Sequence, residues 1–242
     1  MQDWSVRLRD FRAPIFRIVP RFHQTNDGDR MSAAMSRLFP AVLALAAFQS
    51  APLRAQDRMP PIAPEKMTEA QKKAVQEYKQ IRNQDLAGPP WSVLLRVPDL
   101  VVPSLELRLH NQRNSALSPK LTEFAILIAA REWTNNFEWN AHSTLAARAG
   151  LSQNIMAAVA DGRRPEKMAD DEQLLYDFCI ELLHNQSVSD ATYARMLEKF
   201  GEPGIVEAAS LEGYYTFLSM VMNTARSPLA AGVKPALQPF PK

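Results

Sequence analysis

From residue 68 onward, apolar residues recur mainly at intervals of three and four positions along the chain. This spacing is typical of helices that bury one face against a core. Outside the central segment described next, it predicts helices over residues 68–83, 91–96, 102–114, 152–161, 170–184, 190–200 and 204–224. No segment shows the strict alternation of apolar and polar residues that a half-buried strand requires. The pattern therefore predicts an all-α protein.

The central segment, residues 118–151, predicts two helices joined by a short polar turn. Ser118 followed by Pro119 is a typical helix start, because the serine side chain caps backbone amides and proline fits the first turn. Residues 124–130 are apolar on every side of the first helix, so we expect this helix to be buried all round. The turn at residues 134–136 leads into the second helix, which we expect to end at Gly150.

Three ionisable residues lie in this central pair of helices. Glu123 precedes the apolar run of the first helix, and Glu138 and His142 lie four residues apart on the second. Residues four apart share a helix face. Leu145 and Ala149 continue the same face, so we expect Glu138 and His142 to point inward. The three residues form the candidate catalytic site.

Composition and charge exclude several classes of protein. Hydrophobic residues make up 46% of the 242 residues, which is enough for a packed core. Cys179 is the only cysteine, so an intrachain disulfide, a C-x-x-C motif and a cysteine zinc site are excluded. The formal net charge is +2, and the basic excess lies within the first 55 residues. The rest of the chain therefore gives no support for nucleic-acid binding.

The first part of the chain predicts export. Residues 31–55 have the three parts of a secretory signal peptide: Arg37 as the basic part, an apolar run over 38–48, and Ala55 before the cleavage point. The run is too short for a stable membrane anchor. We expect a periplasmic or secreted protein whose translation starts at Met31 or Met35. The alternative is an ordinary amphipathic helix.

These features divide the chain into five segments. Residues 1–30 are expected to be a non-native or disordered extension, and residues 31–55 the signal peptide. Residues 56–67 are proline-rich and predict an extended arm. Residues 68–228 form the helical domain, and residues 229–242 are expected to be a C-terminal tail.

Several motifs of the helical domain resemble the carboxymuconolactone decarboxylase family, which has the alkyl hydroperoxidase D-like fold. The most specific part is Glu123 followed by Glu138-Trp139 and His142. The other matching segments are Gly88-Pro89, Pro98-Asp99-Leu100, Ala149-Gly150-Leu151-Ser152, Ser189-Asp190-Ala191-Thr192-Tyr193 and Gly213-Tyr214-Tyr215. The resemblance covers residues 68–228 and implies a homo-oligomer, a trimer or hexamer. It also implies an enzyme acting on a small molecule.

The hydroperoxidase branch of the family carries a C-x-x-C motif, and its two positions here are Asn135 and Glu138. The resemblance therefore favours the decarboxylase-like branch, which uses neither a thiol nor a cofactor. It implies decarboxylation or isomerisation of a small carboxylic acid or lactone, which is carboxy-lyase chemistry. A peroxide-reducing antioxidant protein and a non-catalytic oligomeric binding protein are the alternative functions.

Imidazole titrates near neutral pH, so His142 is the expected proton relay, with Glu138 orienting it and Glu123 as a second acid or base. The alternatives are a hydrogen-bonded interior histidine at 142, and a structural ion pair of Glu123 with Arg131 or Arg113. The three residues could also bind a metal ion. However, di-metal helical bundles use Glu-x-x-His spacing, and no fourth ligand is evident here, so we expect no metal and no cofactor.

Two further residues are candidate substrate-binding groups. Arg131 could bind a substrate carboxylate through its planar fork, although a surface ion pair with Glu132 or Glu138 is an equal alternative. Trp139 is adjacent to Glu138 and is therefore a candidate substrate contact, and the alternative is packing at a helix or subunit contact. Cys179 lies on an apolar helix face and is expected to be part of the core.

Overall fold

The computed structural model describes residues 57–113 and 115–239, and all regular secondary structure in these ranges is helical. The α-helices are α1 (Glu69–Arg82), α2 (Trp91–Leu94), α3 (Val101–Arg113), α4 (Pro119–Glu132), α5 (Asn136–Arg148), α6 (Gln153–Ala160), α7 (Asp170–Asn185) and α8 (Asp190–Ala225). Two 3-10 helices, η1 (Pro64–Lys66) and η2 (Pro98–Leu100), lie on either side of α1 and α2. The predicted all-α class is therefore confirmed for this part of the chain.

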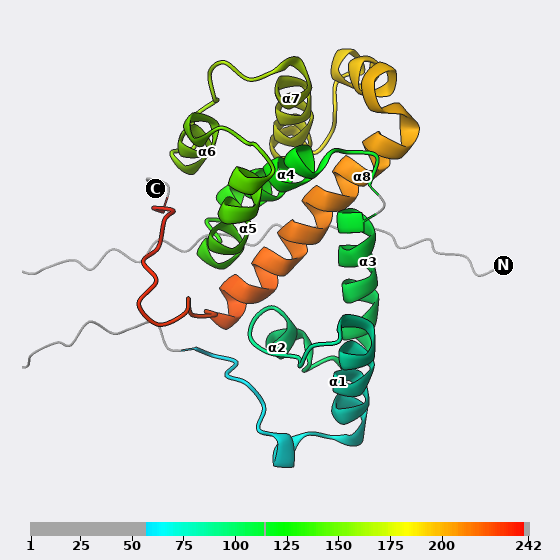
Figure 1. The fold of residues 1–242 in the computed structure, drawn as a ribbon, viewed down its shortest axis with the longest axis vertical. Coiled ribbons are helices and arrows are strands. Elements are labelled where there is room, and N and C mark those ends of the chain that lie inside the picture. The colour runs from blue at the N-terminus through cyan, green and yellow to red at the C-terminus, as the bar shows by residue number, and fades with distance from the viewer. Residues whose placement is uncertain (1–56, 114, 240–242) are drawn as a thin grey trace, which may run out of the picture. The chain divides into compact units, whose positions relative to one another are not determined.

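Helix α4 is the centre of the core. It packs against α5, α7 and α8 (Figure 1), and α8 passes diagonally between α5 and α3 in that view. Residues 124–130 are at most 3% exposed, as expected for a helix that is apolar on every side. Glu123, on the same helix, is therefore a buried carboxylate that the packing of the helix does not require.

The helix ends follow the local signals in the sequence. Ser118 Oγ accepts a hydrogen bond from the Leu121 amide at 3.4 Å, and Pro119 begins α4. Gly150, with φ of 94°, follows the end of α5 as expected. Helix α8 contains the two helices predicted over 190–200 and 204–224, and they meet at a kink at Gly201, where the backbone angles are not helical (φ 67°, ψ 177°).

The described part of the predicted tail, residues 229–239, packs against the helical domain. The side chain of Asn136, the first residue of α5, accepts from the Leu237 amide at 2.8 Å and donates to the Leu237 carbonyl at 3.2 Å. Leu237 itself is 1% exposed and belongs to the core. Hydrogen bonding by one asparagine to both backbone groups of Leu237 holds this segment beside the α4–α5 turn.

The predicted extension over residues 1–30, the predicted signal peptide over 31–55 and the start of the arm at residue 56 lie outside the described residues. Over residues 57–113 and 115–239, none of the helices has the length and apolar character needed to cross a membrane.

Candidate active site

The turn between α4 and α5 positions the second half of the site. Asn135, in extended conformation, caps α5 by accepting a hydrogen bond from the Glu138 amide at 3.0 Å. Its side-chain nitrogen also lies 3.3 Å from Asn223 Oδ1 on α8. Asn135 therefore fixes the first turn of α5 relative to both α4 and α8, and this turn carries Glu138.

The structure brings Glu123, Glu138 and His142 together in the core. His142 Nδ1 lies 2.7 Å from Glu123 Oε2, and His142 Nε2 lies 3.4 Å from Glu138 Oε2. His142 is 3% exposed and Glu138 is 4% exposed, whereas Glu123 retains 9%. One imidazole thus lies between two carboxylates, and each ring nitrogen faces one of them.

The burial of Glu138 and His142 agrees with the prediction, but one step of the reasoning was wrong. Leu145, used to define the inward face of α5, is 38% exposed. Burial of the acid–histidine pair comes from the packing of α5 against α4 and from the Tyr215 ring of α8, and not from a continuous apolar stripe.

Tyr215 on α8 is a site residue that the sequence reasoning did not select. Its ring meets the His142 ring edge-on, with centroids 5.1 Å apart and an interplanar angle of 83°. Tyr215 is 1% exposed, so it closes the site on the α8 side. The helical period of α8 places Tyr215 on the same inward face as Leu211 and Leu218, and Tyr215 also lies in the Gly213-Tyr214-Tyr215 segment noted above.

Charge pairing determines the protonation of His142. Burial alone lowers the pKa of an imidazole, but the hydrogen bonds and charges of Glu123 and Glu138 outweigh it and raise the pKa of His142 to about 9. His142 is therefore an imidazolium at neutral pH.

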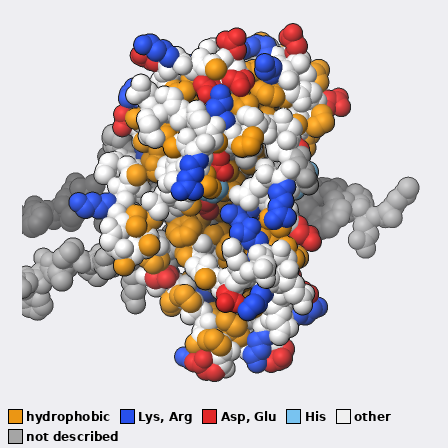
Figure 2. Space-filling model, in the orientation of Figure 1, with side chains coloured by type: hydrophobic (Ala, Val, Ile, Leu, Met, Phe, Trp, Pro, Cys, Tyr) orange, Lys and Arg blue, Asp and Glu red, His pale blue; other side chains and the backbone are white. Residues whose placement is uncertain are grey.

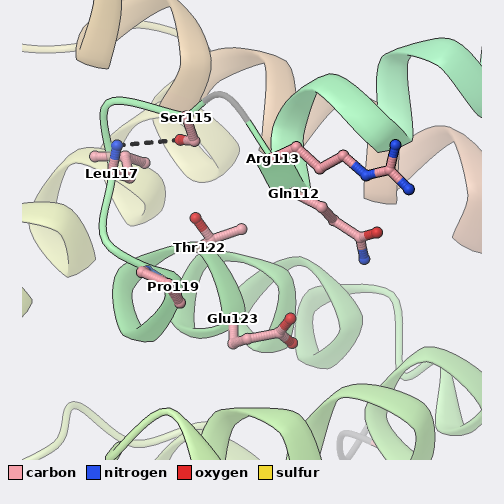
Figure 3. A pocket seen from close by; sticks show the side chains of 7 residues that line it. All are labelled: Gln112, Arg113, Ser115, Leu117, Pro119, Thr122 and Glu123. Atoms are coloured by element: carbon pink, nitrogen blue, oxygen red, sulfur yellow. Dashed lines mark hydrogen bonds between the residues drawn. The ribbon is translucent and has the colours of Figure 1, made fainter.

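Glu123 connects this cluster to a cavity. A cavity of about 360 Å³ lies between the end of α3 and the first turns of α4, and Glu123 is one of its lining residues (Figure 3). Its opposite wall is formed by Gln112 and Arg113 at the end of α3. His142 and Glu138 do not line this cavity. A molecule in the cavity would therefore meet Glu123 first, with His142 directly behind it.

The two residues predicted to bind substrate lie elsewhere. Arg131 borders a smaller cavity of about 90 Å³ beside α6 and α7, and its Nη1 donates to the Gln238 carbonyl at 2.7 Å. Trp139 borders a third cavity of about 440 Å³ between α5 and α6. Neither side chain lines the Glu123 cavity. The structure thus places Arg131 and Trp139 at cavities other than the one that Glu123 lines.

Two other acidic groups of the core region bear on the chemistry. The first is Glu132, the last residue of α4. Its carboxylate pairs with His184 Nε2 at 2.9 Å at the surface of the protein. Glu212 on α8 is 1% exposed, and its carboxyl group lies beside the Cys179 thiol. Burial raises the pKa of Glu212 to about 8, while the hydrogen bond with the Cys179 thiol acts in the opposite direction. Glu212 is therefore mainly a neutral acid at pH 7.

Within the described part of the chain, no group of three or more His, Cys, Asp and Glu side chains is arranged to hold a metal ion. In the Glu123–His142–Glu138 cluster, both ring nitrogens of His142 face carboxylates, and an imidazolium has no lone pair for a metal.

In comparisons with known proteins, no family model and no curated protein sequence matches this chain. The chemistry of the site must therefore be argued from its own geometry.

Proposed function

We propose that the protein is a carboxymuconolactone decarboxylase-like enzyme that decarboxylates or isomerises a small carboxylic acid or lactone by acid–base catalysis, without a cofactor. The observation that carries this proposal is the bridging of two buried carboxylates by His142, with one of them, Glu123, lining a cavity. A histidine that served packing alone would not need two acidic partners, because burying each charge has a cost.

The geometry supports a specific division of roles. Glu123 exchanges a proton with the substrate, because it is the member of the cluster that lines the cavity. His142 supplies or takes up that proton through Nδ1, which is 2.7 Å from Glu123 Oε2. Glu138 holds the other ring nitrogen and stabilises the imidazolium. This order differs from the expectation that His142 itself would meet the substrate.

The two candidate reactions use the same proton relay. In decarboxylation, the bond between the substrate carbon and its carboxylate breaks, CO₂ leaves, and the electron pair remains on the carbon. Glu123 first takes a proton from His142 Nδ1 and passes it to that carbon, and His142 then recovers a proton from solvent, so that each decarboxylation consumes one proton. In isomerisation, Glu123 removes a proton from one carbon and returns it to another, so no proton is lost.

A peroxide-reducing function has less support. Cys179 is fully buried, and burial together with the neighbouring Glu212 raises the pKa of its thiol well above the usual range. A reactive cysteine needs an accessible thiolate. Proton chemistry at Glu123 is therefore the better-supported function.

Turnover and proton exchange test the proposal together. The purified protein is incubated in D₂O with a panel of small β-keto acids and carboxylated γ-lactones. CO₂ release and deuterium incorporation into recovered acid are then measured by NMR. Wild-type protein should catalyse one of these reactions, and Glu123→Gln should not. Equal rates for wild type and Glu123→Gln across the panel would refute the acid–base role.

We also propose that the protein is exported and forms a trimer or hexamer. Val206 and Met220 on α8 are 67% and 45% exposed, and their separation of two heptads places them on one face of the helix. Light scattering of the purified protein measures its molar mass in solution and so tests the trimer or hexamer. Mass spectrometry of exported protein tests export and should find a mature chain that begins near Gln56. A monomer, or an intact segment 38–55 in cytoplasmic protein, would contradict these proposals.

A further inference from the structure

The wall of the cavity opposite Glu123 carries a cation and an amide. Gln112 and Arg113 are the last two residues of α3, across the cavity from α4, and in Figure 3 the Gln112 amide lies nearer the Glu123 carboxylate than the Arg113 guanidinium, which extends along α3. Arg113 and Glu123 are the two charged residues among those that line this space. The cavity thus has one positive and one negative group on facing helices.

The other polar groups of the cavity already have partners or are covered. Ser115 Oγ donates to Glu207 at 2.8 Å and accepts from the Leu117 amide at 3.1 Å. Thr122 is 4% exposed. By contrast, Gln112 and Arg113 are exposed, and neither side chain has a hydrogen bond or ion pair within residues 57–113 and 115–239. These two side chains are the donors that a molecule in the cavity would meet.

The charge of the cluster explains why a cation belongs here. Two acidic side chains, Glu123 and Glu138, share the single imidazole of His142 next to the cavity, and this excess of acidic groups disfavours an anionic substrate. Arg113 supplies a cation at the point of entry. On the face shown in Figure 2, Lys and Arg side chains lie around a hollow near the centre of the picture, with acidic side chains among them.

We propose that Arg113, assisted by Gln112, binds the carboxylate of a small mono- or dicarboxylate and holds its reactive carbon toward Glu123. The guanidinium fork matches the two oxygens of a carboxylate, and the Gln112 amide can donate to one of them. The proposal names the substrate class of the reaction inferred above and rests on that function for its catalytic part. The binding step itself does not require turnover.

Succinate, an unreactive dicarboxylate, tests the binding step, and succinamide is its uncharged analogue. Binding to the whole purified protein is followed by ¹H–¹⁵N NMR titration. Succinate should shift the amide signals around Gln112, Arg113 and Glu123, and succinamide should not. Arg113→Gln should weaken succinate binding roughly tenfold or more, because a charge-assisted hydrogen bond is lost. Arg113→Lys, which keeps the charge but not the fork, should lie in between.

Arg148→Gln is the matched control, because Arg148 is an exposed arginine in the last turn of α5 and lines none of the three cavities described above. It should bind succinate as the wild type does. Glu123→Gln should bind succinate at least as well as wild type, since it removes a like charge. Absence of saturable succinate binding to wild type, or equal affinity in Arg113→Gln, would overturn the assignment of Arg113.

These variants also separate the two proposals. If Glu123→Gln abolishes turnover while Arg113→Gln leaves KM unchanged, the acid–base function stands and the assignment of Arg113 fails. If succinate binding depends on Arg113 but no reaction depends on Glu123, the anion site stands and the enzyme function fails. If both hold, Arg113→Gln should raise KM far more than it lowers kcat.

Discussion

Helix α4 makes two glutamate–histidine contacts that are alike in length but differ in environment. Glu123 meets His142 at 2.7 Å with side-chain exposures of 12% and 4%, whereas Glu132 meets His184 at 2.9 Å with exposures of 35% and 51%. Water screens the outer pair, so it contributes little to stability. The inner pair has no such screening, and Glu138 adds a second carboxylate to it. Burial, and not contact distance, distinguishes a candidate catalytic histidine from a surface one.

The largest expected difference between the two histidines is in turnover. We expect His142→Gln to lower kcat/KM by about 10²–10⁴-fold, the usual contribution of a general acid or base. His184→Gln should leave kcat/KM unchanged. The double variant Glu138→Gln/His142→Gln should be little worse than His142→Gln, because the pair acts as a unit. Both rates are measured on the same substrate and normalised to folded protein. Equal losses in the two histidine variants would remove the functional distinction between the contacts.

The two contacts should also differ in stability. His142→Gln leaves two buried carboxylates without a cation, so we expect it to lower the free energy of unfolding by about 3–5 kcal/mol at pH 7. His184→Gln removes an exposed ion pair and should cost less than about 1 kcal/mol. Urea denaturation of the two variants and the wild type measures this difference. A loss of similar size in both variants would show that burial does not strengthen the inner contact.

The pH dependence of stability should depend on His142. Its pKa rises from 6.5 to about 9 on folding. The folded state thus keeps a proton that the unfolded state releases above pH 6.5. The contribution of His142 is complete below pH 6.5 and is lost as pH rises through 9. It amounts to on the order of 3 kcal/mol.

Unfolding free energies of wild type and His142→Gln, measured from pH 6 to pH 10, isolate this contribution as their difference. This difference in unfolding free energy should shrink between pH 6.5 and pH 9. The control is the difference between wild type and His184→Gln over the same pH range. A difference that grows with pH would mean that the two carboxylates do not hold the proton on His142.

Glu212 extends the comparison to a buried acid without a histidine. Its pKa is raised from 4.5 to about 8, so folding is penalised as pH rises from 4.5 through 8. Glu212→Gln should remove this penalty and raise the free energy of unfolding at pH 7 by about 3 kcal/mol. The two proteins should be equally stable near pH 4. Denaturation at both pH values measures the effect, and a destabilised Glu212→Gln at pH 7 would mean that the carboxylate is ionised and stabilised in the core.

The smallest expected effect concerns Cys179, the neighbour of Glu212. Peroxide reduction with a dithiol donor should be absent, and Cys179→Ala should change neither this assay nor the proposed turnover. The physical reason is the complete burial of the thiol and the absence of a second cysteine in the chain. A robust peroxidase rate in wild type that disappears in Cys179→Ala would favour the hydroperoxidase-like alternative.

Local sequence signals determined the helices and one half of the site. Ser118 and Pro119 set the start of α4, and Gly150 sets the end of α5, because caps and turns depend on only a few neighbouring residues. The proximity of Glu138 and His142 follows from helix geometry alone, since residues four apart share a face. The burial of residues 124–130 followed equally from an apolar surface on every side of one helix.

Only the tertiary structure decided which groups complete the site. Glu123 is 19 residues from His142, and the angle between α4 and α5 determines that these two residues make the shorter contact. Tyr215 of α8 contacts His142, and Arg113 of α3 lines the cavity that Glu123 also lines. Arg131 instead contacts the C-terminal tail, and Trp139 lines a cavity beside α6. Helical periodicity tells which face of a helix is buried. It does not tell which other helix covers that face, because long-range packing is settled by the combined shape of all the side chains in the core.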